Sequence, residues 1–173
     1  EALMGGISLG GQLKRLEEDY DLVKKKRPIF SKEGSQTVRY DVSDMFLRFW
    51  FRYFIKYQSL IEIRNFDRLA DIIIKDYPTF SGLALETYFR QQMMESGEFA
   101  EIGSWWQGTG NDDQSEIDIV GLYFGEKKAL VAEVKRQSKN FRPDLFALKV
   151  ETLRRKALFK YEIASKCLSM EDM

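Results

Sequence analysis

Two stretches, Ser115–Phe124 (SEIDIVGLYF) and Lys128–Lys135 (KALVAEVK), decide the fold of this 173-residue chain. Both are rich in β-branched and aliphatic residues and a glycine-containing turn separates them, so they predict an antiparallel hairpin. Charged residues interrupt these apolar strands at Asp118, Glu133 and Lys135. A buried carboxylate is costly unless it is paired, hydrogen-bonded or bound to a metal. The charges in the hairpin therefore require a specific partner.

The segments around this hairpin predict a compact α/β domain. Two helices and a strand precede it, over 66–78, 81–96 and 101–106, and a helix and a last strand follow it, over 143–158 and 160–168. Pro78 and Gly82 separate the first two helices. The domain's order becomes helix, strand, strand, strand, helix, strand, which suits a layered arrangement.

The amino-terminal part predicts a truncated winged helix. A helix over 8–20 precedes two strands over 22–30 and 37–42, and Ser43-Asp44 then caps an aromatic linking helix. That helix is apolar nearly all round, so we expect it to be buried between two layers. The predicted class is α/β (α+β), with a winged-helix segment at 1–60 and a second domain at 61–173.

Charge is distributed unevenly over these two parts. Residues 1–60 carry 11 basic and 8 acidic residues, whereas 61–173 carry 16 and 19. In a winged helix the hairpin contacts the DNA backbone, so the basic residues of this hairpin are candidate phosphate contacts: Lys24, Lys25, Lys26, Arg27, Lys32 and Arg39. The alternative is a solvated edge strand protected by lysines, and the acidic residues of the preceding helix favour it.

Composition excludes several kinds of catalysis. The chain has no histidine and one cysteine, Cys167, which excludes a Ser-His-Asp triad, a Cys-His dyad, an internal disulfide and the usual zinc sites. No apolar run approaches the roughly 20 residues of a membrane span. We expect a cytoplasmic protein whose chemistry uses carboxylates and lysine.

The hairpin charges offer such chemistry. Glu133 and Lys135, two apart on one strand, point to the same face, and pairing of the strands would bring Asp118 beside them. Mg²⁺ is usually held by one or two carboxylates, with water and phosphate oxygens in its other positions. The sequence therefore predicts a magnesium site that lowers the pKa of bound water, with Lys135 orienting that water.

These residues resemble the PD-(D/E)XK signature of restriction endonucleases and related repair enzymes. The resemblance implies a restriction-endonuclease-like core in which Asp118 and Glu133 bind metal and, with Lys135, form the catalytic set. It also implies that Glu86, on the preceding helix, is a further metal ligand. Gln137 lies just beyond the motif, where some members of the family carry a polar residue. The proline of the signature is absent, since Glu116-Ile117-Asp118 stands in its place.

A second resemblance covers most of the chain. The stretches RPIFSKEG, VRYDVSDMFLRFWFRYF, EIDIVGL and AEVKRQ are similar to the C-terminal domain of archaeal-type AAA-class ATPases of prokaryotes. That resemblance implies an upstream ATPase domain in the same polypeptide, and ATP would bind there because this chain has no GxxxxGK[ST] motif.

Three functions stay open at this point. The first is a Mg²⁺-dependent phosphodiesterase acting on DNA, with Lys139, Arg142, Arg154, Arg155 and Lys156 lining the DNA path or forming a solvated helix face. The second is a non-catalytic DNA-binding or regulatory domain with a degenerate nuclease fold. The third is an oligomerisation module that forms homo-oligomers. Trp105-Trp106 could stack on bases, although strand alternation predicts that one of them packs in the core.

Overall fold

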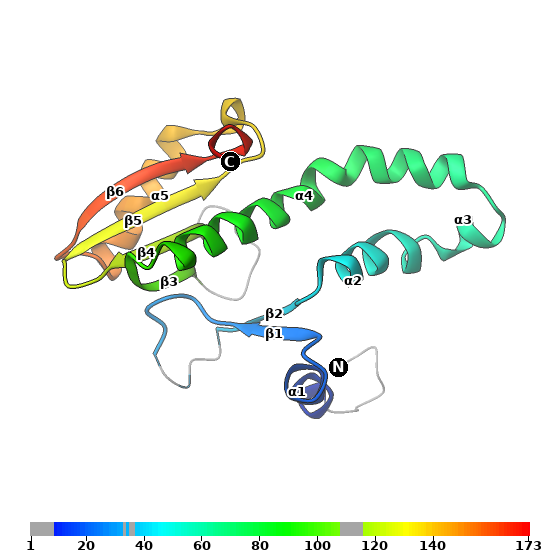
Figure 1. The fold of residues 1–173 in the computed structure, drawn as a ribbon, viewed down its shortest axis with the longest axis horizontal. Coiled ribbons are helices and arrows are strands. Elements are labelled where there is room, and N and C mark those ends of the chain that lie inside the picture. Colours follow the sequence, from blue (N-terminus) through cyan, green and yellow to red (C-terminus); the bar gives the residue numbers. More distant parts are fainter. Residues whose placement is uncertain (1–8, 33, 35–36, 108–115) are drawn as a thin grey trace. The chain divides into compact units, whose positions relative to one another are not determined.

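The computed structural model describes residues 9–32, 34, 37–107 and 116–173. It confirms a mixed α/β fold with helices, a two-stranded sheet and a four-stranded mixed sheet (Figure 1). The chain forms two compact units, one of residues 1–26 and 38–73 and the other of 27–37 and 74–173. These bounds differ from the predicted 1–60 and 61–173. Among the described residues, no helix combines the length and apolarity needed to cross a bilayer.

The first unit contains the expected helix and hairpin. Helix α1 spans Leu9–Glu18, and strands β1 (Val23–Lys26) and β2 (Arg39–Val42) pair antiparallel with Val23 opposite Val42. Ser8, which falls within the predicted helix, lies outside the described residues. Asp44 caps the next helix as predicted, because its side chain accepts a hydrogen bond from Leu47 N at 2.8 Å.

The aromatic segment differs from its prediction. It begins as α2 (Met45–Phe49), widens into the π-helix η2 (Trp50–Ile55) and is followed by α3 (Gln58–Glu62). Within it only Tyr53 is buried, whereas Phe46 is 66% exposed and Phe51 52% exposed. The expected burial between two layers was wrong. Apolar residues occupy most of the circumference of the helix, interrupted by Arg48 and Arg52, while the short strands β1 and β2 can cover only one side of it.

The predicted helix break at Pro78 was also wrong. A single helix, α4, runs from Phe66 to Ser96 with Pro78 inside it. Proline cannot donate a hydrogen bond to the carbonyl four residues earlier, which weakens a helix at that point. Here the Pro78 carbonyl accepts a bond from Ser81 Oγ at 3.2 Å, and apolar residues beyond the proline pack into the core, so the helix continues.

The four-stranded sheet has the order β3-β4-β5-β6. Its strands are β3 (Phe99–Trp106), β4 (Glu116–Tyr123), β5 (Lys128–Val134) and β6 (Glu162–Leu168). The first three pair antiparallel and β6 pairs parallel to β5, after the crossover helix α5 (Pro143–Lys156). The predicted strands and their order are confirmed, and the turn between β4 and β5 places Gly125 at φ 68°, which glycine adopts readily.

Helices α4 and α5 pack against opposite faces of this sheet (Figure 1). One cluster joins Phe146, Val150 and Leu153 of α5 to strand residues that include Val120 and Val131. The other joins α4 to strand residues, through Leu85, Phe89, Met93, Ile119, Ala132 and Val134. Alternate residues of β5 therefore enter different clusters, so Glu133 lies on the α5 face of the strand.

Both tryptophans of β3 are buried, at 6% exposure for Trp105 and 5% for Trp106. Strand alternation predicted that one of them would pack in the core. The register shifts between Gly103 and Trp105, because Gly103 pairs with Val120 and Trp105 with Ile117. Two steps on β3 thus match three on β4, so the bulge is in β4. Trp105 and Trp106 themselves pair regularly with Ile117 and Glu116, so their side chains point to opposite faces. Both can be buried because helices cover both faces of the sheet.

Candidate functional site

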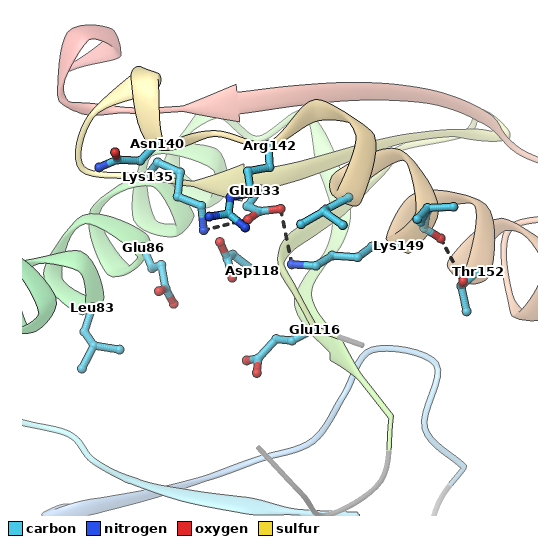
Figure 2. Close-up of a pocket in the computed structure, with 12 residues that line it drawn as sticks. Leu83, Glu86, Glu116, Asp118, Glu133, Lys135, Asn140, Arg142, Lys149 and Thr152 are labelled. Atoms are coloured by element: carbon cyan, nitrogen blue, oxygen red, sulfur yellow. Dashed lines mark hydrogen bonds and ion pairs between the residues drawn. The ribbon is translucent and has the colours of Figure 1, made fainter. Parts of the chain in front are cut away.

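A cleft of about 720 Å³ opens at the end of the sheet where β4 begins and β5 ends. It takes side chains from α4, β4, β5 and α5, and Figure 2 shows its charged residues facing the same hollow. The described residues that line it are Leu83, Glu86, Glu116, Asp118, Glu133, Lys135, Asn140, Arg142, Leu145, Leu148, Lys149 and Thr152. The cleft brings together all four residues that the sequence predicted for catalysis or metal binding.

Asp118 lies at the bulge of β4 and is held by both its backbone and its side chain. Its carbonyl accepts hydrogen bonds from Ser104 Oγ at 2.8 Å and from Arg90 Nη2 at 3.0 Å. Its carboxylate Oδ2 accepts one from Val134 N, on the neighbouring strand, at 2.7 Å. Bulges commonly occur beside active sites, where they redirect a side chain. The position of Asp118 is therefore fixed by three neighbouring segments.

Glu133 lies opposite Asp118 if the β4–β5 register, in which Ile119 pairs with Ala132, is continued by one residue. It is a charged residue with only 7% exposure. Its Oε1 is 2.7 Å from Lys135 Nζ and its Oε2 is 3.4 Å from Lys149 Nζ. Two ammonium groups thus offset the cost of burying this carboxylate.

The protonation of the cleft follows from its burial and charges. Burial raises the pKa of the Asp118 carboxyl above its usual value, and the hydrogen bond from Val134 and the charge of Lys135 oppose this only in part. For Lys135, burial alone would lower the pKa of its ammonium. The hydrogen bond and charge of Glu133 outweigh burial, so the pKa of Lys135 lies above its usual value. Lys135 is therefore a permanent cation at neutral pH.

Glu86, on α4, lines the cleft together with Glu116 at the start of β4. Within 9–32, 34, 37–107 and 116–173, however, no three Asp, Glu, Cys or His side chains are arranged to hold a metal ion. The ligand set of Glu86, Asp118 and Glu133 therefore stays a prediction. Gln137 is exposed, just before the 3₁₀ turn η4 (Ser138–Asn140), and does not line the cleft.

The predicted nucleic-acid contacts of the hairpin have different surroundings. Lys24 and Lys25 are exposed on β1, and the Lys25 ammonium lies 5.8 Å from the centre of the Tyr40 ring. Lys26 is ion-paired with Asp41, and Arg39 lies opposite it on β2. Arg27 and Lys32 are exposed in the segment that belongs to the second unit. Their role in DNA binding stays a prediction.

Sequence reasoning missed two supports of the cleft. Arg90 and Ser104 bind the Asp118 carbonyl and each other, with Arg90 Nη2 at 2.7 Å from Ser104 Oγ, and no sequence signal marked this pair. Lys149 was also missed, although its signal was visible. It is spaced three and four residues from the buried Phe146 and Leu153 of α5, and a lysine on an apolar helix face needs a carboxylate partner.

Comparisons with known proteins identify relatives without an assigned activity. Residues 50–156 match a family, DUF234, described as archaeal and bacterial proteins of unknown function. An uncharacterized protein of Methanocaldococcus jannaschii is 32% identical over 130 residues. The match covers 71% of this chain but 28% of that relative. No solved structure matches the chain with significance.

Proposed function

The chain belongs to this DUF234 family of archaeal and bacterial proteins, and we propose that its cleft binds DNA and cleaves phosphodiester bonds with a divalent metal. One observation carries the proposal. The carboxylates of Asp118 and Glu133, on neighbouring strands, line the same cleft as Lys135, and Lys135 is bonded to Glu133 at 2.7 Å. Two carboxylates can hold a divalent ion that activates a water, and an ammonium can stabilise the charge that develops on the phosphate, so these groups could hydrolyse a phosphodiester without histidine.

The donor set of the cleft fits a hard cation. Asp118 and Glu133 offer carboxylate oxygens, and neither histidine nor cysteine lines the cleft. Such ligands suit Mg²⁺ or Mn²⁺, and Mg²⁺ is commonly held by one or two carboxylates while it keeps several waters. Asp118 and Glu133 would hold the ion, and Glu86 lines the same cleft.

When bound, the ion would activate a water and neutralise the charge that builds up on the phosphate. Asp118 would keep its position because backbone and side-chain hydrogen bonds fix it. The raised pKa of Lys135 keeps its ammonium protonated, so this residue would orient the water and stabilise negative charge rather than remove a proton. Arg142 extends the cationic lining on the α5 side of the cleft.

The natural protein would also contain an ATPase domain. The chain spans 28% of its Methanocaldococcus jannaschii relative, which leaves length for such a domain in that protein. We propose that ATP binds there, and that this chain supplies the part that contacts DNA.

Cleavage of plasmid and single-stranded DNA with Mg²⁺ or Mn²⁺ tests the proposal. Asp118→Asn and Lys135→Met should each lower the rate by at least about 100-fold, since one removes a ligand charge and the other a charge-stabilising group. Glu126→Gln and Lys128→Met are matched controls, because this exposed pair lies at the opposite end of β5. Wild-type rates in the Asp118 and Lys135 variants would refute the cleft as the site of cleavage.

A second candidate function is DNA binding by the hairpin without cleavage. The exposure of Lys24 and Lys25 favours it, since no acidic side chain among the described residues forms an ion pair with either of them, whereas Lys26 pairs with Asp41. Charge reversal of Lys25 and of Arg27 should weaken DNA binding and flatten its salt dependence. Lys75→Glu on α4 provides the control. Unchanged binding in both variants would contradict this function.

A further inference from the structure

The carboxylate of Glu133 is ion-paired with two lysines, whose ammonium nitrogens lie at unequal distances from its oxygens. Lys135 Nζ is 2.7 Å from one oxygen and Lys149 Nζ is 3.4 Å from the other. Figure 2 marks both contacts with dashed lines. Coulomb attraction falls with distance, and only the shorter contact has the length of a charge-assisted hydrogen bond. Lys149 is therefore the more easily displaced of the two.

The position of Lys149 is set by the packing of α5. Phe146, Val150 and Leu153 bury one face of the helix against the sheet. Lys149 lies at the edge of that face, where its side chain is 15% exposed and lines the cleft. Arg142, the residue before α5, lines the cleft too. Both cations therefore face the space that a substrate would occupy.

A divalent ion would make the cleft more attractive to a phosphate. Among the described residues, the lining includes four carboxylates and three cationic groups, which give one excess negative charge when all are ionised. A bound divalent cation would add two positive charges to this set, and a phosphate is drawn to positive potential.

We propose that Lys149 is a phosphate-binding residue that exchanges partners. It pairs with the Glu133 carboxylate in the absence of a cation. It would turn to a phosphate oxygen of the nucleic acid when a cation competes for that carboxylate. An ammonium is well suited to the exchange, because it binds a phosphate as a mobile point charge. The inference rests on the proposed function and adds an order of binding, with the cation before the nucleic acid.

Two binding measurements on Lys149→Met test the exchange without any measurement of cleavage. Mn²⁺ titration without nucleic acid should show roughly tenfold tighter binding, because a competing positive charge has been removed from Glu133. Ca²⁺ takes the same oxygen ligands. In its presence, binding of an oligonucleotide should weaken about tenfold, and the slope of the logarithm of the binding constant against the logarithm of salt concentration should fall in magnitude by about one. Lys128→Met, at the far end of β5, should change neither.

The opposite signs separate the proposed role from a structural one, since a misfolded cleft would weaken both kinds of binding. Lys149→Arg keeps the charge and should restore oligonucleotide binding toward the wild-type value. Unchanged Mn²⁺ affinity in Lys149→Met, or unchanged oligonucleotide binding, would overturn the exchange. If both shifts occur but wild type does not cleave DNA, cleavage fails while the phosphate site stands. If wild type binds no Mn²⁺, both proposals fail.

Discussion

The side chain of Asp118 is hydrogen-bonded to the backbone of Val134, with Oδ2 2.7 Å from the amide nitrogen. This bond ties the bulge of β4 to the end of β5, one residue after Glu133. The position of the cleft carboxylates thus depends on a contact between a catalytic candidate and the main chain of the neighbouring strand. Substitutions of Asp118 that keep or remove the acceptor of this hydrogen bond should therefore separate its effect on stability from its effect on cleavage.

Asp118→Leu should destabilise the fold more than Asp118→Asn does. Leucine leaves the buried Val134 amide without its acceptor, which costs about 1–3 kcal/mol, whereas the asparagine carbonyl can still accept the bond. Urea denaturation of the two variants and wild type measures the difference. Equal stability of the two variants would show that the bond contributes nothing, even though both variants should lose cleavage.

The raised pKa of Asp118 predicts how stability depends on pH. Because burial raises the pKa in the folded state, the folded protein binds a proton that the unfolded chain has already released at the same pH. Stability should therefore fall as pH rises from about 4, the unfolded value, through the folded pKa. Asp118→Asn lacks this loss, so its melting temperature relative to wild type should increase across that window. A constant difference would contradict the prediction.

The lowered pKa of Asp41 predicts the opposite dependence of stability on pH. Burial works against its charge, but the Lys26 ammonium and the Arg48 guanidinium hold the pKa of Asp41 below its usual value. The stabilisation is present above the unfolded pKa and is lost as pH falls through the folded pKa. Asp41→Asn should therefore lower the melting temperature at pH 7 and have little effect in acid. A larger effect in acid than at pH 7 would refute it.

At two glycines of the second unit, replacement by alanine should change the stability of the fold in opposite directions. A Cβ at Gly121, on β4, would lie 2.7 Å from the Phe99 ring and 2.8 Å from Met93 Cε, so Gly121→Ala should cost about 1–3 kcal/mol through overpacking. A Cβ at Gly82, inside α4, would meet nothing within 4 Å, so Gly82→Ala should stabilise by about 0.5–1 kcal/mol. Chemical denaturation measures both. A stabilising Gly121→Ala would show that Phe99 and Met93 move freely.

The sequence by itself determined the order of strands and helices in the second unit. Apolar alternation in 115–124 and 128–135 and the glycine turn between them sufficed to predict β4 and β5, because such patterns are local. Asp118, Glu133 and Lys135 stood out as charges inside apolar strands, so the main groups of the cleft were visible too. These residues lie on the two strands of one predicted hairpin, and paired strands lie side by side, so the sequence predicted that the residues would lie close together.

Tertiary structure decided what local patterns could not. Pro78 lies inside a continuous helix because packing beyond it outweighs the missing hydrogen bond, and both Trp105 and Trp106 are buried because helices cover both faces of the sheet. The link from Lys149 to Glu133 joins residues from a helix and a strand. The distance and burial that set the strength of such a pair exist only once α5 is packed on the sheet.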